Sequence, residues 1–184
     1  MLNFKMNNQA LNMQRNDCRR LGGFTLIELM ITIVIAAILA GVAIPSFVNM
    51  VASNRMTGEI NAVVAGLNFA RSEAIKRGEA VFVCPATSPT TTTAACTSTT
   101  TWSSGWIVLD TSNAPPPLQI SGAFTSGDTL RSQTTTTGVR FNQMGYTAYT
   151  DTITLHDKNS TPNLYRCIIF SAGSWTIAKG TSCP

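Results

Sequence analysis

The sequence predicts an α+β fold in which one long N-terminal helix packs against an antiparallel β-sheet. Three observations favour this class. An apolar run covers residues 24–44, one apolar stripe at helical spacing continues to Arg77, and the patterned segments after Glu79 are rich in β-branched and aromatic residues. Because only strands follow this helix, we expect a β-sheet to pack against its apolar stripe.

The run from Phe24 to Ile44 has the length of a membrane span. Its 21 residues contain one charged side chain, Glu28, and as a helix they cover about 30 Å, the thickness of a bilayer core. We expect a transmembrane helix over residues 24–45. Positive charge before the span keeps that side cytoplasmic, so the remainder is expected to face outward. The preceding segment has one acid, Asp17, and four basic residues, Lys5, Arg15, Arg19 and Arg20.

Glu28 needs an explanation, because an acid at the centre of a spanning helix costs roughly 2.5–3.5 kcal/mol and is rarely kept without a partner. Its shallow position, five residues into the run, lowers this cost. If the chain were cut after Gly23, the new α-amino group of Phe24 would be a cation at the same depth. Glu28 of the same chain or of a neighbouring copy could then pair with it.

The stretch Gly22-Gly23-Phe24-Thr25-Leu26-Ile27-Glu28-Leu29 resembles the class III signal of type IV pilins and type II secretion pseudopilins. The resemblance implies that a prepilin peptidase cuts after Gly23 and methylates Phe24. It also implies that Glu28 aligns subunits in a filament. Residues 1–23 would then be a cleaved leader, with Gly22, Gly23 and Phe24 as the processing site.

Three other interpretations of the N-terminus compete with this one. A secretory signal could be cut after Gly41-Val42-Ala43, and a plain anchor would fit the length of the run. Neither explains Glu28. Arg19-Arg20 suggests a twin-arginine signal, although a pilin leader accounts for the pair equally well. Met6 or Met13 is also a candidate start within the leader.

From Ser46 to about Arg77 the pattern changes from apolar all round to one apolar face. Pro45 is expected to kink or loosen the helix, and Gly78 is expected to end it. Charged pairs at i,i+4, Arg55 with Glu59 and Glu73 with Arg77, are expected on the wetter sides. The predicted buried stripe consists of Met56, Ile60, Val63, Leu67, Ala70 and Ala74.

Six short runs after Glu79 predict strands, with glycine, proline and asparagine between them. Two threonine-rich stretches, residues 87–101 and 134–137, lack apolar alternation and are expected to be exposed loops. The predicted strands are residues 80–84, 106–109, 138–141, 152–155, 165–170 and 174–178. Residues 46–184 should therefore form one head, with the helix to about residue 77 followed by the sheet.

Further segments resemble the GspH/FimT family of minor pilins and pseudopilins, including members of the FimT or FimU type. They are residues 68–78, the Gly105–Asp110 segment and the Arg140–Gly145 segment. With the N-terminal motif, the resemblance covers nearly the whole chain after the leader. It implies a type IV pilin fold, in which a long helix, half transmembrane and half amphipathic, packs against an antiparallel sheet.

Four cysteines remain after the leader, which contains Cys18, and an even number in an outward-facing domain indicates disulfides. Four cysteines allow three pairings. We favour Cys84–Cys96 and Cys167–Cys183, because each closes a short loop, worth about 3 kcal/mol in the chain-entropy model. A zinc site is not expected, since no close C-x-x-C pair is present and His156 is the single histidine.

The composition excludes several functions. The net charge of +4 comes mostly from the leader, and the rest of the chain has nine basic and eight acidic residues, so the high pI is no evidence for nucleic-acid binding. His156 is alone, and Asp151 and Asp157 have no nucleophile motif near them. We expect no enzymatic activity, no cofactor and no metal.

The resemblance implies a minor pilin, a structural subunit that helps a type IV pilus to assemble, in twitching, adhesion or DNA uptake. The alternative is a GspH-like pseudopilin of a type II secretion system. In either case the expected partners of this chain are other pilins or pseudopilins, the inner membrane and the prepilin peptidase. The head would face the periplasm of a Gram-negative bacterium before joining a pilus or pseudopilus.

A second alternative is a DNA-binding minor pilin for natural transformation. Some FimT-type relatives capture DNA through arginines in the C-terminal hairpin, but this chain has Gly173-Ser174-Trp175-Thr176 at the matching place. Since phosphate contacts dominate affinity for DNA, their loss makes this function less favoured. The residues expected to contact DNA, if any do, are Arg131, Arg140, Arg166, Trp175 and Lys179.

Overall fold

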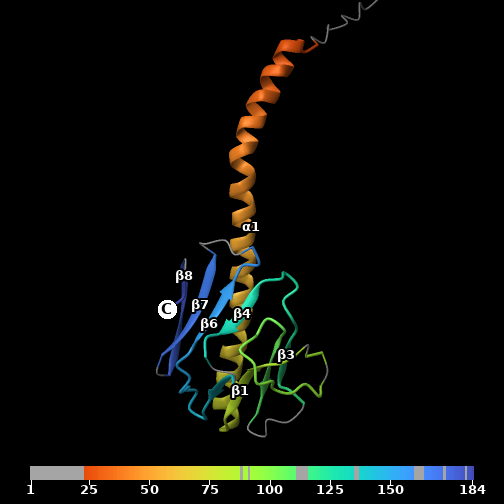
Figure 1. Ribbon diagram of the computed structural model, residues 1–184. Helices are drawn as coiled ribbons and strands as arrows, with labels where there is room; N and C mark the ends of the chain where they lie inside the picture. Colours follow the sequence, from red (N-terminus) through yellow and green to blue (C-terminus); the bar gives the residue numbers. More distant parts are fainter. Residues whose placement is uncertain are drawn as a thin grey trace, which may run out of the picture. The chain divides into compact units, whose positions relative to one another are not determined.

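The structure is a computed structural model that describes residues 23–87, 89–90, 92–110, 116–134, 137–159, 164–171, 173–180 and 182–184. Over these residues the chain forms one helix, α1 (Leu26–Arg77), and eight strands (Figure 1). α1 continues through Pro45. The chain divides into two compact units between Ala43 and Ile44, and each unit is described by itself. Of the predicted leader, residues 1–23, all residues before Gly23, including Gly22, lie outside the described residues.

In the head, residues 44–184, α1 buries one face. The buried positions recur at steps of three or four, as the sequence predicts for a helix packed on one side. They are Ala52, Met56, Ile60, Val63, Gly66, Leu67, Ala70 and Ala74. Gly78 ends the helix with a positive φ of 67°, and its N–H donates to the Ala74 carbonyl at 3.0 Å. Glycine adopts this left-handed conformation without the Cβ penalty that other residues incur.

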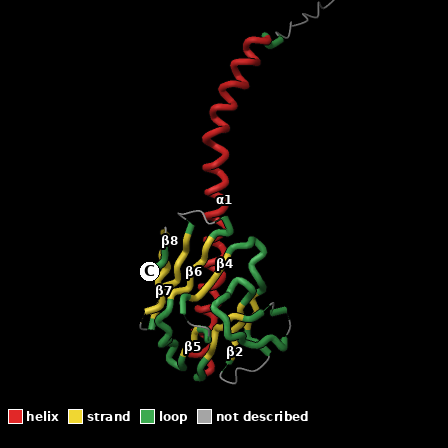
Figure 2. The backbone as a smooth tube through the Cα atoms, in the orientation of Figure 1, coloured by secondary structure: helices red, strands yellow, loops and turns green. Residues whose placement is uncertain are grey.

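The described strands form two four-stranded antiparallel sheets, in the orders β3-β2-β1-β5 and β4-β6-β7-β8. Figure 2 shows both groups of strands beside the head part of α1. The first sheet contains β1 (Val81–Pro85), β2 (Trp106–Leu109), β3 (Gln119–Ser121) and β5 (Val139–Phe141). The second contains β4 (Thr129–Ser132), β6 (Thr152–His156), β7 (Tyr165–Ser171) and β8 (Ser174–Gly180).

Both sheets pack on the same face of α1 and share one hydrophobic core with it. The largest side chains in this core are Trp102 and Trp106, which are 0% and 1% exposed. The first sheet contributes Val81, Val83, Val108, Val139 and Phe141 to the core, and the second contributes Leu130, Ile153, Leu155, Ile168 and Phe170. The α+β class and the packing of helix against antiparallel strands are therefore confirmed.

The prediction of a single sheet is incomplete. All six predicted strands are present with boundaries shifted by at most three residues, but β3 and β4 are additional. β3 has three residues, and its one apolar side chain, Ile120, is exposed. β4 has four residues, of which Leu130 is the one large apolar side chain. Strands this short carry too few side chains to show the alternation on which the prediction depends.

Candidate functional site: the N-terminal segment and the head surface

Thr25 caps the N-terminus of α1. Residues 23–25 are not helical, and the Thr25 hydroxyl oxygen accepts the backbone N–H of Glu28 at 3.2 Å. The Thr25 carbonyl accepts the first α-helical bond, from Leu29 N–H at 3.1 Å. Thr25 and Glu28 thus occupy the N-cap and N3 positions of a Thr-x-x-Glu capping sequence. This places the Glu28 carboxylate in the first turn, where the helix dipole favours negative charge.

Gly23 and Phe24 precede this cap in open surroundings. No heavy atom beyond the chain neighbours lies within 4 Å of a Cβ built on Gly23, and Phe24 is 79% exposed. The peptide bond between these residues is therefore in a non-helical and accessible segment.

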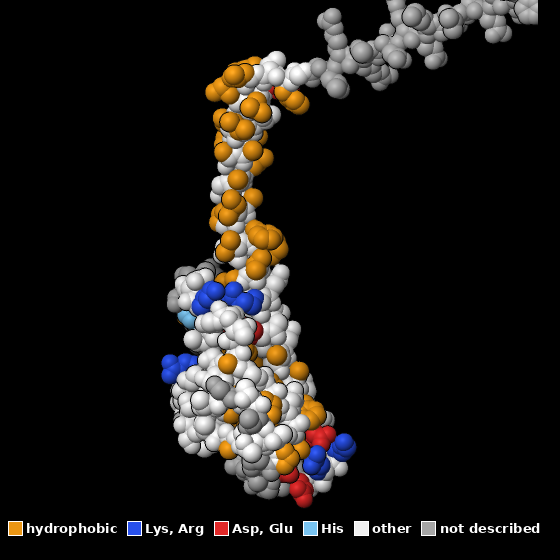
Figure 3. All heavy atoms as spheres, turned by 90° about the vertical axis from the view of Figure 1, so that its right-hand side faces the viewer, with side chains coloured by type: hydrophobic (Ala, Val, Ile, Leu, Met, Phe, Trp, Pro, Cys, Tyr) orange, Lys and Arg blue, Asp and Glu red, His pale blue; other side chains and the backbone are white. Residues whose placement is uncertain are grey.

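The N-terminal part of α1 exposes an unusually long apolar surface. From Gly23 to Val51 every residue is exposed except Ala40, which is half-buried. Figure 3 shows the hydrophobic side chains that cover this part of the helix. Among the described residues α1 is the one helix that is long and apolar enough to cross a membrane, with a mean hydropathy of 2.6 in its most apolar window. An apolar surface of this size requires lipid or other apolar helices around it.

Two of the five residues predicted to contact DNA are engaged within the head. Arg166 is 7% exposed; its guanidinium donates to the Ser53 hydroxyl at 2.8 Å and to the Tyr165 carbonyl at 3.1 Å. Trp175 is half-buried, edge-on to Phe141 with ring centroids 5.7 Å apart. The Arg71 guanidinium lies 5.9 Å from the centre of the Trp175 ring. Arg166 is therefore engaged by groups of the head, and Trp175 is packed among Phe141 and Arg71.

The other three, Arg131, Arg140 and Lys179, are exposed but do not share a surface. Arg131 and Lys179 belong to β4 and β8, the two opposite edges of one sheet. Arg140 belongs to the other sheet and lies over the Phe82 ring. Since affinity for nucleic acid needs several cations along one path, this arrangement offers little to a DNA strand.

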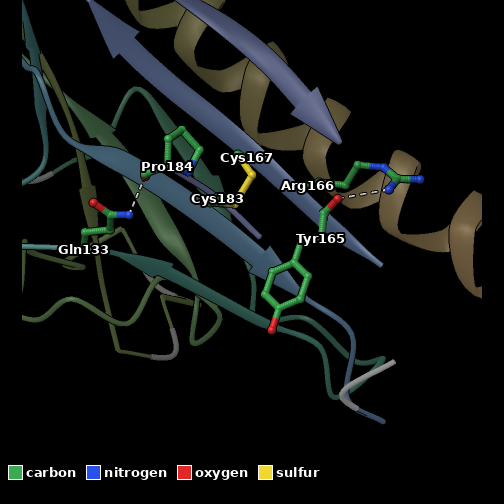
Figure 4. The surroundings of a disulfide bond; sticks show 6 residues. All are labelled: Gln133, Tyr165, Arg166, Cys167, Cys183 and Pro184. Atoms are coloured by element: carbon green, nitrogen blue, oxygen red, sulfur yellow. Dashed lines mark hydrogen bonds between the residues drawn. A yellow bond between two sulfur atoms is a disulfide. The ribbon is translucent and has the colours of Figure 1, made fainter. Parts of the chain in front are cut away.

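Both disulfides join the cysteines that the short-loop argument pairs. Cys84–Cys96 links β1 to the threonine-rich loop, and with Ala86, Ile107 and Leu109 it forms a small second core on the outer side of the first sheet. Cys167–Cys183 ties the C-terminal residues to β7 (Figure 4). The Gln133 side-chain amide also donates to the Pro184 carbonyl at 2.6 Å, so the end of the chain is held at two points.

A buried charge network between α1 and the second sheet was not foreseen. The Arg55 guanidinium donates to both carboxylate oxygens of Asp128 at 2.8 Å and to Asp157 at 2.5 Å. Both aspartate side chains are fully buried. The predicted surface pair of Arg55 with Glu59 is therefore wrong, because Arg55 turns to the aspartates. Its partners lie 73 and 102 residues away, so local spacing carries no sign of them. The other predicted pair forms, with Arg77 Nε 2.8 Å from Glu73.

Glu59 adds a third acid to this network. Burial raises the pKa of Glu59, and the nearby Asp128 charge raises it further, against a hydrogen bond from Ser126 that lowers it. Burial would also raise the pKa of Asp128, but hydrogen bonds from Arg55, the Lys158 backbone and Glu59 outweigh it, so this pKa is lowered. The two pKa values are shifted in opposite directions, so Glu59 binds a proton more readily and Asp128 keeps its charge more readily.

The described residues contain no cluster of three or more histidine, cysteine or acidic side chains that could hold a metal. His156 stacks at a tilt on Tyr165, with ring centroids 4.4 Å apart. The surfaces available for function are therefore the capped, apolar N-terminal helix and the outside of the head.

A capped apolar helix with an acid in its first turn, joined to a head of antiparallel sheets on the same helix, defines a pilin-type filament subunit. Residues 18–44 match the prokaryotic N-terminal methylation motif, and residues 59–174 match the family of the type II transport protein GspH. Since the second match covers more than half of the chain, the chain belongs to the GspH family, which unites pseudopilins with minor type IV pilins.

Among solved structures, the chain is similar to the type IV minor pilin FimU of Pseudomonas aeruginosa. In one crystal form the TM-score is 0.52 at 18% identity, over 75% of this chain and 96% of that chain. In another the TM-score is 0.49 at 18% identity, over 73% of this chain and 96% of that chain. At this identity the likeness shows the fold. No curated protein sequence matches the chain.

Proposed function

We propose that this chain is a minor pilin of a type IV pilus, a structural subunit without catalytic activity that helps the filament to assemble. The observation that carries the proposal is the N-terminal segment. A cap at Thr25, an acid at Glu28 and an uncovered apolar helix together suit a subunit that waits in a membrane and then packs among other apolar helices.

In this proposal a prepilin peptidase cuts after Gly23 and methylates Phe24. Residues 24–45 span the inner membrane of a Gram-negative bacterium, and residues 46–184 form a periplasmic head. The disulfides support the placement of the head outside the cytoplasm. Mass spectrometry of the mature N-terminus tests the processing step: methyl-Phe24 is the expected terminus, and Ile44 or an intact leader contradicts it.

Glu28→Ala tests the alignment role, with Glu28→Gln as the matched control for size. Both variants are expected to be cleaved, since Gly23 and Phe24 are unchanged. Both are expected to enter filaments at least about tenfold less than the wild type, because the partner cation of Glu28 would be left unpaired in an apolar environment. The measurement is the ratio of this subunit in sheared filaments to that in membranes. Normal incorporation of Glu28→Ala overturns the role.

The second candidate, a pseudopilin of type II secretion, is supported by the name of the matched family. The same segment would then enter a short periplasmic filament. Deletion of the gene separates the two: loss of twitching with normal export of secreted enzymes supports the pilus, and the reverse result supports secretion. Complementation with the wild-type chain is the control.

A further inference from the structure

A shallow hollow lies where the head begins on α1. Its volume is about 350 Å³, and its walls include Phe47, Val51 and Arg55 from α1 with Lys158 and Asn159 from the turn after β6. We call it the neck hollow. It joins an apolar surface to basic side chains in one place, an arrangement that suits an amphipathic ligand.

The apolar side of the neck hollow follows the apolar run in the sequence. In sequence, no charged residue lies between Glu28 and Arg55. Phe47 and Val51 remain 63% and 48% exposed in the head. At about 1.5 Å per residue they lie roughly 5 and 10 Å along the helix from Ile44, which compares with a headgroup layer of about 5–7 Å on each side of a bilayer core.

The polar side of the neck hollow presents cations. Lys158 is exposed, and its backbone N–H is held by Asp128 at 3.0 Å. The neighbouring carboxylates, Asp128 and Asp157, have fully buried side chains that Arg55 binds, while the Arg55 side chain itself is 28% exposed. The charge that reaches solvent at this edge is therefore positive.

We propose that the neck hollow binds the phosphate of an anionic phospholipid headgroup while the subunit resides in the membrane. Lys158 and the exposed part of Arg55 contact the phosphate, Val51 contacts the headgroup, and Phe47 contacts the glycerol and the upper acyl chain. The inference rests on the membrane anchoring of α1. A lipid is favoured over another protein because the hollow combines an apolar wall at headgroup depth with basic side chains, the combination that binds interfaces.

Hydrogen exchange on the full chain tests the proposal, with vesicles of phosphatidylcholine alone and vesicles that contain about a third phosphatidylglycerol. The reporters are the Lys158 and Asn159 amides, which donate to Asp128 and Asp157. We expect their exchange to be about fivefold slower in the anionic vesicles, from the contribution of one basic side chain at a charged surface. Added salt should reduce this difference by screening.

Two variants and one internal reference make the result specific. Lys158→Glu should abolish the difference between lipids, and Lys158→Gln should reduce it. Lys76→Glu makes the same charge change at an exposed position at the other end of the head helix. This variant should leave the difference between the two lipids unchanged. The Met144 and Tyr146 amides, held by Asn142, correct for any general change of exchange rate near a charged surface.

Each outcome decides between proposals. If the chain does not float with either kind of vesicle, the membrane anchoring fails. If it floats but Lys158 and Asn159 exchange equally in both lipids, or if Lys76→Glu has the same effect as Lys158→Glu, the lipid site is overturned. Protection that appears only when other pilin subunits are added, whatever the lipid, also overturns it, because the hollow would then be a contact between subunits.

Discussion

Glu59 and Asp128 show how one buried residue pair connects packing to pH. Arg55 binds both buried aspartates, so one guanidinium faces three acids, and its charge lowers the pKa of Glu59 less than burial raises it. One carboxylate oxygen of Glu59 is buried without a hydrogen-bond partner. A protonated Glu59 can donate to Asp128, whereas an ionised Glu59 faces a second negative charge.

Glu59→Gln should therefore stabilise the head at neutral pH. The pKa of Glu59 is raised by folding from its ordinary value of 4.5, so the stability that its protonated form gives is present below about pH 4.5 and is lost as pH rises through the folded-state pKa. At pH 7 we expect Glu59→Gln to raise the free energy of unfolding by about 1 kcal/mol, a value that already allows for solvent screening. At pH 4 we expect little gain.

Urea unfolding at the two pH values measures this effect. Glu79→Gln, at an exposed position after α1, controls for the loss of one negative charge. A gain at pH 7 that persists unchanged at pH 4 would contradict the assignment of the raised pKa to Glu59.

At the level of elements, α1 and the longer strands could be predicted because each carries its own local signal. The apolar stripe repeats over about six turns, from Ala52 to Ala74, and β7 and β8 are seven residues each. The division into two sheets could not be predicted in the same way. It depends on which strand edges pair, such as β1 with β5 across 56 or more residues, and local pattern does not encode such pairings.

Some features of the candidate site could likewise be predicted from the sequence, and others could not. The acid at Glu28 could be predicted because it is the one charged side chain in an apolar run. The cap at Thr25 was missed, although the local Thr-x-x-Glu spacing could have indicated it. The neck hollow could not, because Phe47 and Lys158 meet only through the folded head. The disulfides could be predicted because each closes a short loop, of 12 and 16 residues.

Replacement by alanine at two glycines of α1, Gly66 and Gly58, is expected to change the stability of the head in opposite directions. A Cβ on Gly66 would lie 2.1 Å from the ring of Trp106, which is 1% exposed in β2 and cannot move away. Gly66→Ala should therefore destabilise the head by about 1–3 kcal/mol, more than the gain in helix propensity returns. No atom lies within 4 Å of a Cβ on Gly58, so Gly58→Ala should stabilise by about 0.5–1 kcal/mol.

Thermal unfolding of both variants, followed by near-ultraviolet circular dichroism, checks this pair. The two substitutions are two turns apart on one helix, so helix propensity affects both alike and cancels in the comparison. Equal shifts of Tm would mean that Trp106 does not press on Gly66 as the structure shows.

For the whole molecule, stability and assembly belong to different parts of the chain. Among the described residues every buried side chain lies at or after Ala52, so the head should keep its complete core without the membrane segment. A head that starts at Ser46, with both disulfides formed, should be soluble without detergent. Its Tm should lie within a few degrees of that of the full chain in detergent, since no buried contact is lost.

Gly66→Ala in the same truncated head provides the reference, because it should lower Tm by several degrees through the overpacked Trp106. If truncation alone lowers Tm as much as this substitution does, the membrane segment stabilises the head. The separation of stability and assembly between different parts of the chain is then wrong. If truncation leaves Tm unchanged while abolishing entry into filaments, the exposed apolar surface of α1 is kept for assembly. Because lipid is about as apolar as the neighbouring helices that would replace it, packing between helices rather than hydrophobic burial would then drive that step.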